Sequence, residues 1–252
     1  MTIPRACVLA ALTALDHRRL QALMRRLAVV RDRGRPWSRS LGQRVLIACT
    51  ALRTNLTMRE LAAVFGISKS STHRIVAAMI PRLAALAASP ARHDRRWSWI
   101  VDGTLIPTRD HRYAAKSKNY RWSCNAQVLV RRRDLKVITT SVAGPGNRND
   151  PVHYRASPRL AFLCAAHGRV LADGGYRGVT GLITPTFRGR RIVRDRAWRR
   201  HRRRRARVEH ALARLKDWRV LRDHRRRGQC LADTLNAVAF LHNLRQDIRD
   251  NS

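Results

Sequence analysis

The spacing of apolar residues changes once along this chain of 252 residues, near Trp97. Before that point apolar residues recur every three or four positions, as they do from Leu20 to Leu27, and this is the spacing of amphipathic helices. After it, short apolar runs bounded by polar turns are typical of strands. We therefore predict an all-helical region over residues 1–90, followed by a second region with a sheet over residues 93–252.

The second region alternates strand and helix patterns. We predict strands at 97–101, 123–130, 136–142 and 169–172, with a polar turn at 131–134, and helices at 151–166, 206–221 and 230–248. Strands followed by helices in this order predict an α/β class, with a mixed sheet and helices on its faces.

Basic residues greatly outnumber acidic ones. The chain holds 53 Lys and Arg against 16 Asp and Glu, a formal net charge of +37. Such an excess predicts a polyanionic partner, and nucleic acid is the default because phosphate neutralisation dominates that kind of binding. A GC-rich genome would explain a preference for arginine over lysine, but not the scarcity of acids. The densest stretch, 188–227, holds 19 basic residues against 4 acidic ones.

The sequence gives no support for a membrane-spanning protein, a secreted protein or a zinc protein. No run of about 18 apolar residues is present, so we expect no membrane span. The short apolar stretch from Ala6 to Leu15 is followed by arginines, which favours an amphipathic helix over a signal peptide. The five cysteines are widely spaced and none forms a CxxC pair, which favours reduced cysteines of a cytoplasmic protein over a zinc site or a disulfide framework.

Residues 57–79 have the spacing of a helix-turn-helix. Thr57 and Glu60 fit a capping box, Gly66 would break the first helix, and Ser68 would cap a second that ends near Met79. An ordinary helical hairpin has the same local pattern, but the charge of the chain favours a DNA reader. The second helix would then offer its polar side chains to the major groove, namely Lys69, Ser70, Ser71, His73 and Arg74.

Three acids stand out against the basic background. Asp102 and Asp173 each end an apolar run, and acids at strand ends project where open sheets place their sites. Glu209 lies four residues after Arg205 and seven before Lys216, a spacing that predicts one shared helix face. Carboxylate oxygens are the ligands that Mg²⁺ prefers. Taken singly, each aspartate could merely end a strand, and Glu209 could merely pair with Arg205.

The order and spacing of these motifs resemble the DDE transposases of bacterial insertion sequences, of the IS5 type. Val-Asp-Gly-Thr-Leu-Ile-Pro-Thr at 101–108 looks like the first-Asp motif, and Ala-Asp-Gly-Gly-Tyr-Arg-Gly at 172–178 looks like the second. Arg205-x3-Glu209-x6-Lys216 is similar to part of the third motif, and residues 144–150 resemble the loop between the motifs. Arg202 departs from the pattern, because relatives often carry Tyr there. The likeness covers nearly the whole chain, including the helix-turn-helix.

The resemblance implies a ribonuclease-H-like core in which Asp102, Asp173 and Glu209 are catalytic and hold Mg²⁺ or Mn²⁺, two ions per site. It implies cleavage at the element ends and joining of the freed 3′-hydroxyl to target DNA. The partners would be double-stranded DNA, as terminal inverted repeats and target, and further copies of the chain, as a homodimer or larger assembly on the bacterial nucleoid. Further DNA contacts would come from the basic residues near the third motif, namely Arg203, Arg204, Arg205 and Lys216.

Two alternatives remain open at this point. A DNA-binding protein without catalysis, such as a regulator or a domesticated transposase, accounts for the helix-turn-helix and the charge but not for the three acids. A related nuclease that cuts without joining accounts for the helix-turn-helix, the charge and the three acids. Asp150, in the loop between the motifs, is interpreted as a loop cap in preference to a functional residue, and the second interpretation stays open.

Overall fold

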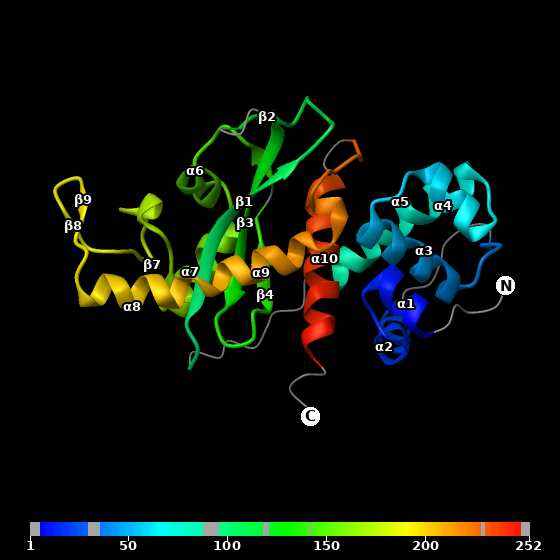
Figure 1. Cartoon of the computed structure of the whole chain (residues 1–252), viewed down its shortest axis with the longest axis horizontal. Coiled ribbons are helices and arrows are strands. Elements are labelled where there is room, and N and C mark those ends of the chain that lie inside the picture. Colours follow the sequence, from blue (N-terminus) through cyan, green and yellow to red (C-terminus); the bar gives the residue numbers. More distant parts are fainter. Residues whose placement is uncertain are drawn as a thin grey trace.

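The computed structural model describes residues 6–29, 36–87, 96–117, 121–141, 143–227 and 230–247. A body of helices forms one side of the molecule and a mixed sheet the other, with the long helix α10 (Cys230–Gln246) between them (Figure 1). No helix in the described part of the chain is long and apolar enough to cross a membrane.

The first region is helical, as its apolar spacing predicts. Its helices are α1 (Ala6–Thr13), α2 (His17–Ala28), α3 (Leu41–Thr54), α4 (Met58–Phe65) and α5 (Lys69–Leu86). Thr57 and Glu60 form the predicted capping box of α4, and Ser68 caps α5. Gly66 ends α4 with a φ of 61°, a left-handed conformation that glycine adopts without a steric penalty. The predicted helix-turn-helix is therefore present.

Helix α5 runs on to Leu86, so its predicted end near Met79 is wrong. Pro81 lies inside the helix, where a proline removes one backbone hydrogen bond. Ile80 and Leu83 are nonetheless fully buried in the core that α5 shares with α10. Burial of a large aliphatic side chain contributes about 1.5–3 kcal/mol, which offsets the local cost of the proline.

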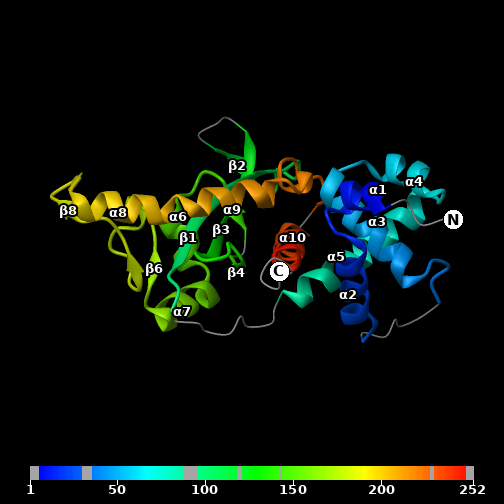
Figure 2. The same cartoon turned by 60° about the horizontal axis from the view of Figure 1, so that its bottom comes forward.

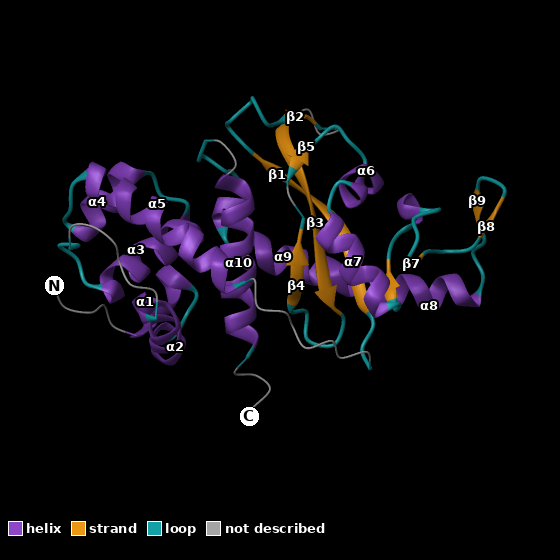
Figure 3. Ribbon diagram, turned by 180° about the vertical axis from the view of Figure 1, so that it is seen from behind, coloured by secondary structure: helices purple, strands orange, loops and turns teal. Residues whose placement is uncertain are grey.

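The second region contains the predicted mixed sheet (Figure 3). Its strands are β1 (Trp99–Pro107), β2 (Ala115–Lys116), β3 (Trp122–Arg131), β4 (Val137–Thr140), β5 (Gly144–Pro145), β6 (Val170–Leu171) and β7 (Leu182–Ile183). The order is β2-β3-β1-β6-β7, and β4 and β5 also pair with β3. Strand β1 is antiparallel to β3 and parallel to β6, which in turn is parallel to β7.

Helices cover both faces of the sheet, as predicted. They are α6 (Asp150–Arg155), α7 (Pro158–His167), α9 (Arg207–Lys216) and α10. Side chains alternate along a strand, so Ile100 packs in the core with α9 and α10, while Val101 packs in a second core with α6 and α7. This arrangement confirms the α/β class and agrees with the ribonuclease-H-like core that the resemblance implies.

A basic arm extends from the sheet, away from the first five helices (Figure 2). It consists of a hairpin, β8 (Phe187–Arg188) and β9 (Arg191–Ile192), and of α8 (Arg196–Arg205), which has no buried residue. Helix α9 follows after Ala206, and a short 3-10 helix η2 (Arg219–Leu221) completes the stretch that the apolar spacing predicts as one helix.

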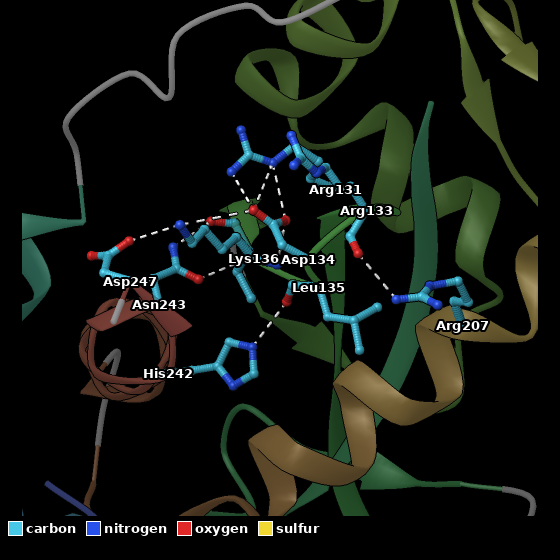
Figure 4. Close-up of polar contacts among 10 residues, drawn as sticks. Arg131, Arg133, Asp134, Leu135, Lys136, Arg207, His242, Asn243 and Asp247 are labelled. Carbon is cyan, nitrogen blue, oxygen red and sulfur yellow. Dashed lines mark hydrogen bonds and ion pairs between the residues drawn. The ribbon is translucent and has the colours of Figure 1, made fainter. Parts of the chain in front are cut away.

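The turn between β3 and β4 is fixed by both of the last two helices (Figure 4). Asp134 accepts hydrogen bonds from Arg131 within the turn. Arg207, at the start of α9, donates to the carbonyl oxygens of residues 132 and 133 at 2.8 and 3.1 Å. His242 of α10 lies 2.9 Å from the carbonyl oxygen of Leu135. These contacts set the place of α9 against the sheet.

The cores of the two predicted regions are joined. Helix α10 belongs to the second region by sequence but packs extensively on α5 of the first. One hydrophobic cluster accordingly runs from Leu9 through α3 and α5 to the sheet residue Ile100. The predicted boundary near residues 90–93 lies outside the described residues, so the division into 1–90 and 93–252 stays a prediction.

Candidate functional site

Asp102 lies in the middle of β1, so its predicted position at the end of a strand is wrong. Strand β1 continues to Pro107 because β3 pairs with every residue from Trp99 onward. The parallel strand β6 pairs only with Trp99 and Ile100. The pairing with β6 therefore ends two residues before Asp102. At Asp102 itself, β1 pairs with β3 on one side and no longer with β6 on the other.

Asp173 occupies the equivalent position after β6. Leu171 is the register partner of Ile100, and each aspartate comes two residues after its member of this pair. Asp173 begins the 3-10 helix η1 (Gly174–Tyr176), and its carboxylate accepts a hydrogen bond from the Gly175 amide at 2.8 Å. The structure thus places Asp102 and Asp173 near each other, just past the end of the pairing between β1 and β6.

The surroundings of Asp102 make its ionised form costly. Burial raises the pKa of Asp102 to about 6. Arg205 opposes this rise through an ion pair, with its Nη1 2.9 Å from Oδ2 of Asp102, while the charges of Asp173 and Asp150 add to it. A partly buried carboxylate beside two others has a deficit of positive charge, which a bound cation would relieve.

Asp150 is the acid that the sequence interpretation assigned wrongly. It is not a loop cap: Asn149 precedes α6 as the N-cap residue, and no side chain there caps the helix. The Asp150 carboxylate turns toward the sheet, where its Oδ1 accepts hydrogen bonds from the amides of Asn125 and Gln127 at 2.8 and 3.0 Å. No local pattern indicates these partners, because they lie more than twenty positions away on β3.

Glu209 is the predicted catalytic acid that the structure does not bring to the two aspartates. It lies exposed in the first turn of α9, whose buried side carries Val208 and Ala211. Within the described parts of the chain, no group of three or more His, Cys, Asp and Glu is close enough to hold a metal ion. The metal-binding triad of Asp102, Asp173 and Glu209 therefore stays a prediction, with two of its members adjacent.

Arg205, Glu209 and Lys216 do not share one continuous helix, in contrast to the prediction. Helix α8 ends at Arg205 and α9 begins at Arg207, with Ala206 between them. Lys216 is half-buried in a groove of 530 Å³ beside Arg222. Burial lowers the pKa of Lys216, and the charge of Arg222 adds to the effect.

The residues predicted to read DNA lie along the start of α5. Exposed among them are Lys69, Ser70, His73 and Arg74. Ser71 is half-buried, and its hydroxyl oxygen accepts a hydrogen bond from the Ser68 hydroxyl at 3.0 Å. Thr72 is buried and donates to the Ser68 carbonyl at 3.0 Å, which explains a polar residue at a core position. Arg74 is thus better placed for a base contact than Ser71.

The predicted backbone-binding arginines belong to the basic arm. Arg203 and Arg204 are exposed on α8, whereas Arg205 is half-buried on Asp102. His201 fixes this helix near the site, since its Nε2 lies 2.9 Å from the carbonyl oxygen of Ala172, the residue before Asp173. Nothing in the sequence points to His201, because the contact joins segments 29 residues apart.

Comparisons with known proteins match both regions. Residues 101–243 match the family described as DDE superfamily endonuclease, and residues 40–89 match the helix-turn-helix of DDE superfamily endonuclease. A protein of Streptomyces albus G, named as a transposase for insertion sequence element IS112, is 42% identical over 219 residues, which cover 84% of this chain and 83% of that protein. These matches confirm the resemblance to the DDE family and the helix-turn-helix that the sequence predicts, and the IS5 type stays a prediction.

Proposed function

The chain belongs to the DDE superfamily of endonucleases, and on that premise we propose that it is an insertion-sequence transposase. It would cut DNA at the element ends and join the freed 3′-hydroxyl to target DNA. The observation that carries the proposal is the pair of aspartates, Asp102 and Asp173, each of which follows the last paired residue of β1 and β6 by two positions. In a chain with a net charge of +37, two such neighbouring acids are best explained by a cation that they hold.

We propose that Asp102, Asp173 and Glu209 hold Mg²⁺ or Mn²⁺, two ions per site. The donor set fits such ions, because it consists of carboxylate oxygens and the pKa of Asp102 is raised by burial without enough compensating charge. Arg205 supplies part of that compensation by its ion pair with Asp102. When bound, two such ions activate a water molecule and stabilise the leaving oxygen of a phosphodiester. Glu209 would have to turn from solvent toward the aspartates.

The basic side chains position the DNA in this proposal. Arg203 and Arg204 on the exposed α8 would contact backbone phosphates, as would Lys216 and, when it releases Asp102, Arg205. The start of α5 would read the terminal inverted repeats. Backbone contacts fix the register of a duplex, while contacts to base edges carry its sequence. The chain would act as a homodimer or larger assembly on paired ends, at the nucleoid in the cytoplasm where its DNA lies.

The test is cleavage of a duplex that carries one element end, with Mn²⁺ or Mg²⁺. Asp102→Asn, Asp173→Asn and Glu209→Gln should each abolish cleavage and leave DNA binding intact or stronger, because a negative charge near phosphate is lost. Asp247→Asn, on the surface pair with Lys136, is the matched control and should cleave normally. Near-normal cleavage by any one of the three variants would remove that residue from the site.

One observation favours a second candidate, a DNA-binding protein without catalysis. Arg205 occupies an oxygen of Asp102, and Glu209 stands apart in solvent, as it would in a protein that has lost the reaction. Absence of metal-dependent cleavage by the unmodified protein would select this candidate. Cleavage without transfer of the 3′ end to a second duplex would instead select a nuclease that cuts without joining.

A further inference from the structure

A buried network of hydrogen bonds links α6, β3 and the turn that Asp173 begins. It begins at Asp150, whose Oδ1 accepts from Nδ2 of Asn125 at 2.8 Å and from Nε2 of Gln127 at 3.0 Å. The Oε1 of Gln127 in turn accepts a hydrogen bond from the hydroxyl of Tyr176. Gln127 and Tyr176 are completely buried and Asn125 nearly so, which makes each of these partners difficult to replace with water.

Each end of this hydrogen-bond network lies beside a predicted catalytic acid. The Asp150 carboxylate lies directly against Gly103, the residue after Asp102, and a Cβ at that position would overlap it. Tyr176 is the last residue of η1, the turn that Asp173 begins. The Asp150 carboxylate therefore contacts the backbone beside Asp102 directly. It is also linked, by hydrogen bonds through Gln127, to the turn that begins with Asp173.

A carboxylate is a suitable acceptor at the start of such a hydrogen-bond network. Hydrogen bonds to a carboxylate are roughly twice as strong as those between neutral groups, and Asp150 receives two of them on one oxygen. The cost is a third negative charge near the aspartate pair, which adds to the raised pKa of Asp102. A cation bound by Asp102 and Asp173 would relieve this cost, so the network is best satisfied when the site is loaded.

We propose that Asp150 is a positioning residue of the site, which sets the Asp173 turn relative to Asp102 through Asn125, Gln127 and Tyr176. The proposal rests on the proposed function. It assigns to Asp150 the role of a hydrogen-bond acceptor, and not that of a metal ligand. An asparagine at position 150 still offers an oxygen to the two amides, whereas an alanine offers none. Asn125 would then keep only its longer hydrogen bond, at 3.4 Å, to the carbonyl oxygen of Arg148, and Nε2 of Gln127 only its hydrogen bond to Oδ1 of Asn125 at 3.2 Å.

The test uses the full-length protein with Asp150→Ala, Asp150→Asn and Tyr176→Phe, each alone, and Tyr176→Phe combined with Asp150→Ala. The matched control is Asp247→Ala, an exposed acid directly after the last helix. Three quantities are measured: Mn²⁺ affinity without DNA by electron paramagnetic resonance of the free ion, the Mn²⁺ concentration for half-maximal cleavage, and amide hydrogen exchange of residues 173–178.

Asp150→Ala should weaken Mn²⁺ binding about tenfold, because two buried donors lose their closer acceptor, and Asp150→Asn by no more than about threefold. Exchange in the 173–178 turn should quicken in the same order. Adding Tyr176→Phe to Asp150→Ala should change little further, because both act through Gln127 and effects along one network are not additive. The control should match the unmodified protein in all three quantities.

Equal losses in Asp150→Ala and Asp150→Asn would overturn the proposal, since the charge and not the acceptor would then matter. A lower melting temperature with unchanged Mn²⁺ affinity would also overturn it, as a purely structural role. If Asp150→Ala does not fold, Tyr176→Phe removes a single oxygen and decides the question by the same measurements. An unmodified protein that neither binds Mn²⁺ nor cleaves would sink the proposed function instead, while faster exchange at 173–178 in Asp150→Ala would still support the positioning role.

Discussion

The guanidinium of Arg205 lies 2.9 Å from the carboxylate of Asp102, so the end of the basic arm supplies charge to the partly buried acid of the candidate site. Arg205 opposes the rise of the Asp102 pKa, which stands at about 6. Arg205→Ala should raise that pKa further and move the acid limb of a Mn²⁺-dependent cleavage profile to higher pH. Arg204→Ala, an exposed neighbour, is the control and should leave the limb in place. Coincident profiles for both variants would contradict the role given to this ion pair.

Asp102 should also make the metal-free protein less stable at high pH. Its folded-state pKa is raised from 3.8 to about 6, so the folded state holds the proton more tightly, and this stabilisation is lost as the pH rises from about 4 through 6. Asp102→Asn should remove that pH dependence, which amounts to at most about 3 kcal/mol over the whole range and to about half of that between pH 5 and pH 8. The measurement is the free energy of unfolding at pH 5 and pH 8 without metal. If the stability of Asp102→Asn depends on pH as that of the unmodified protein does, Asp102 is not the source of the pH dependence.

The exposed arginines of α8 should make DNA binding steep in salt. Each phosphate contact contributes about 0.9 to the slope of log K against log salt, so Arg203→Ala with Arg204→Ala should flatten it by about 1.8. Lysine at both positions keeps the charge and serves as the control. If the alanine variant keeps the full slope, this part of the arm does not touch DNA.

Arg74 should carry sequence preference. Arg74→Ala should cost about 1–3 kcal/mol on the true terminal repeat and much less on random duplex, where phosphates supply the affinity. Ser71→Ala should cost less on the repeat, because the Ser71 hydroxyl is already bonded to Ser68. Arg59→Ala, exposed on α4, is the control. Competition binding should use the full-length chain, since α5 shares its core with α10; equal losses on both duplexes would exclude Arg74 as a reader.

Asp134 should stabilise the β3–β4 turn in a pH-dependent way. Burial acts to raise its pKa, but the hydrogen bonds and charges of Arg131 and Lys136 together outweigh burial and hold the pKa below its usual value. Its contribution is therefore complete above about pH 4 and is lost as the pH falls through the lowered folded-state pKa. Asp134→Asn should cost about 1–3 kcal/mol of unfolding free energy at pH 7 and less in acid. Asp247→Asn, at a more exposed pair, should cost under about 1 kcal/mol, and equal costs would contradict the difference in burial.

Much of the local structure follows from residues close together in the sequence. Helical spacing, the capping box of Thr57 and Glu60, and the turn at Gly66 each depend on groups within a few positions of one another. The order of the acidic motifs likewise identifies the family and the two strand aspartates. These features are predictable because helix and strand periods, caps and turns are properties of short segments.

Tertiary contacts decided the rest. Asp102 lies within a strand because β3 continues beside it, and α5 passes Pro81 because α10 covers its apolar side. Arg205 meets Asp102 across 103 positions, and Asp150 meets its two amides across more than twenty. Apolar spacing tells which face of a segment is buried but not which distant polar group lies there. Those partners are selected by packing and by the need to satisfy every buried donor and acceptor, and both exist only in the folded chain.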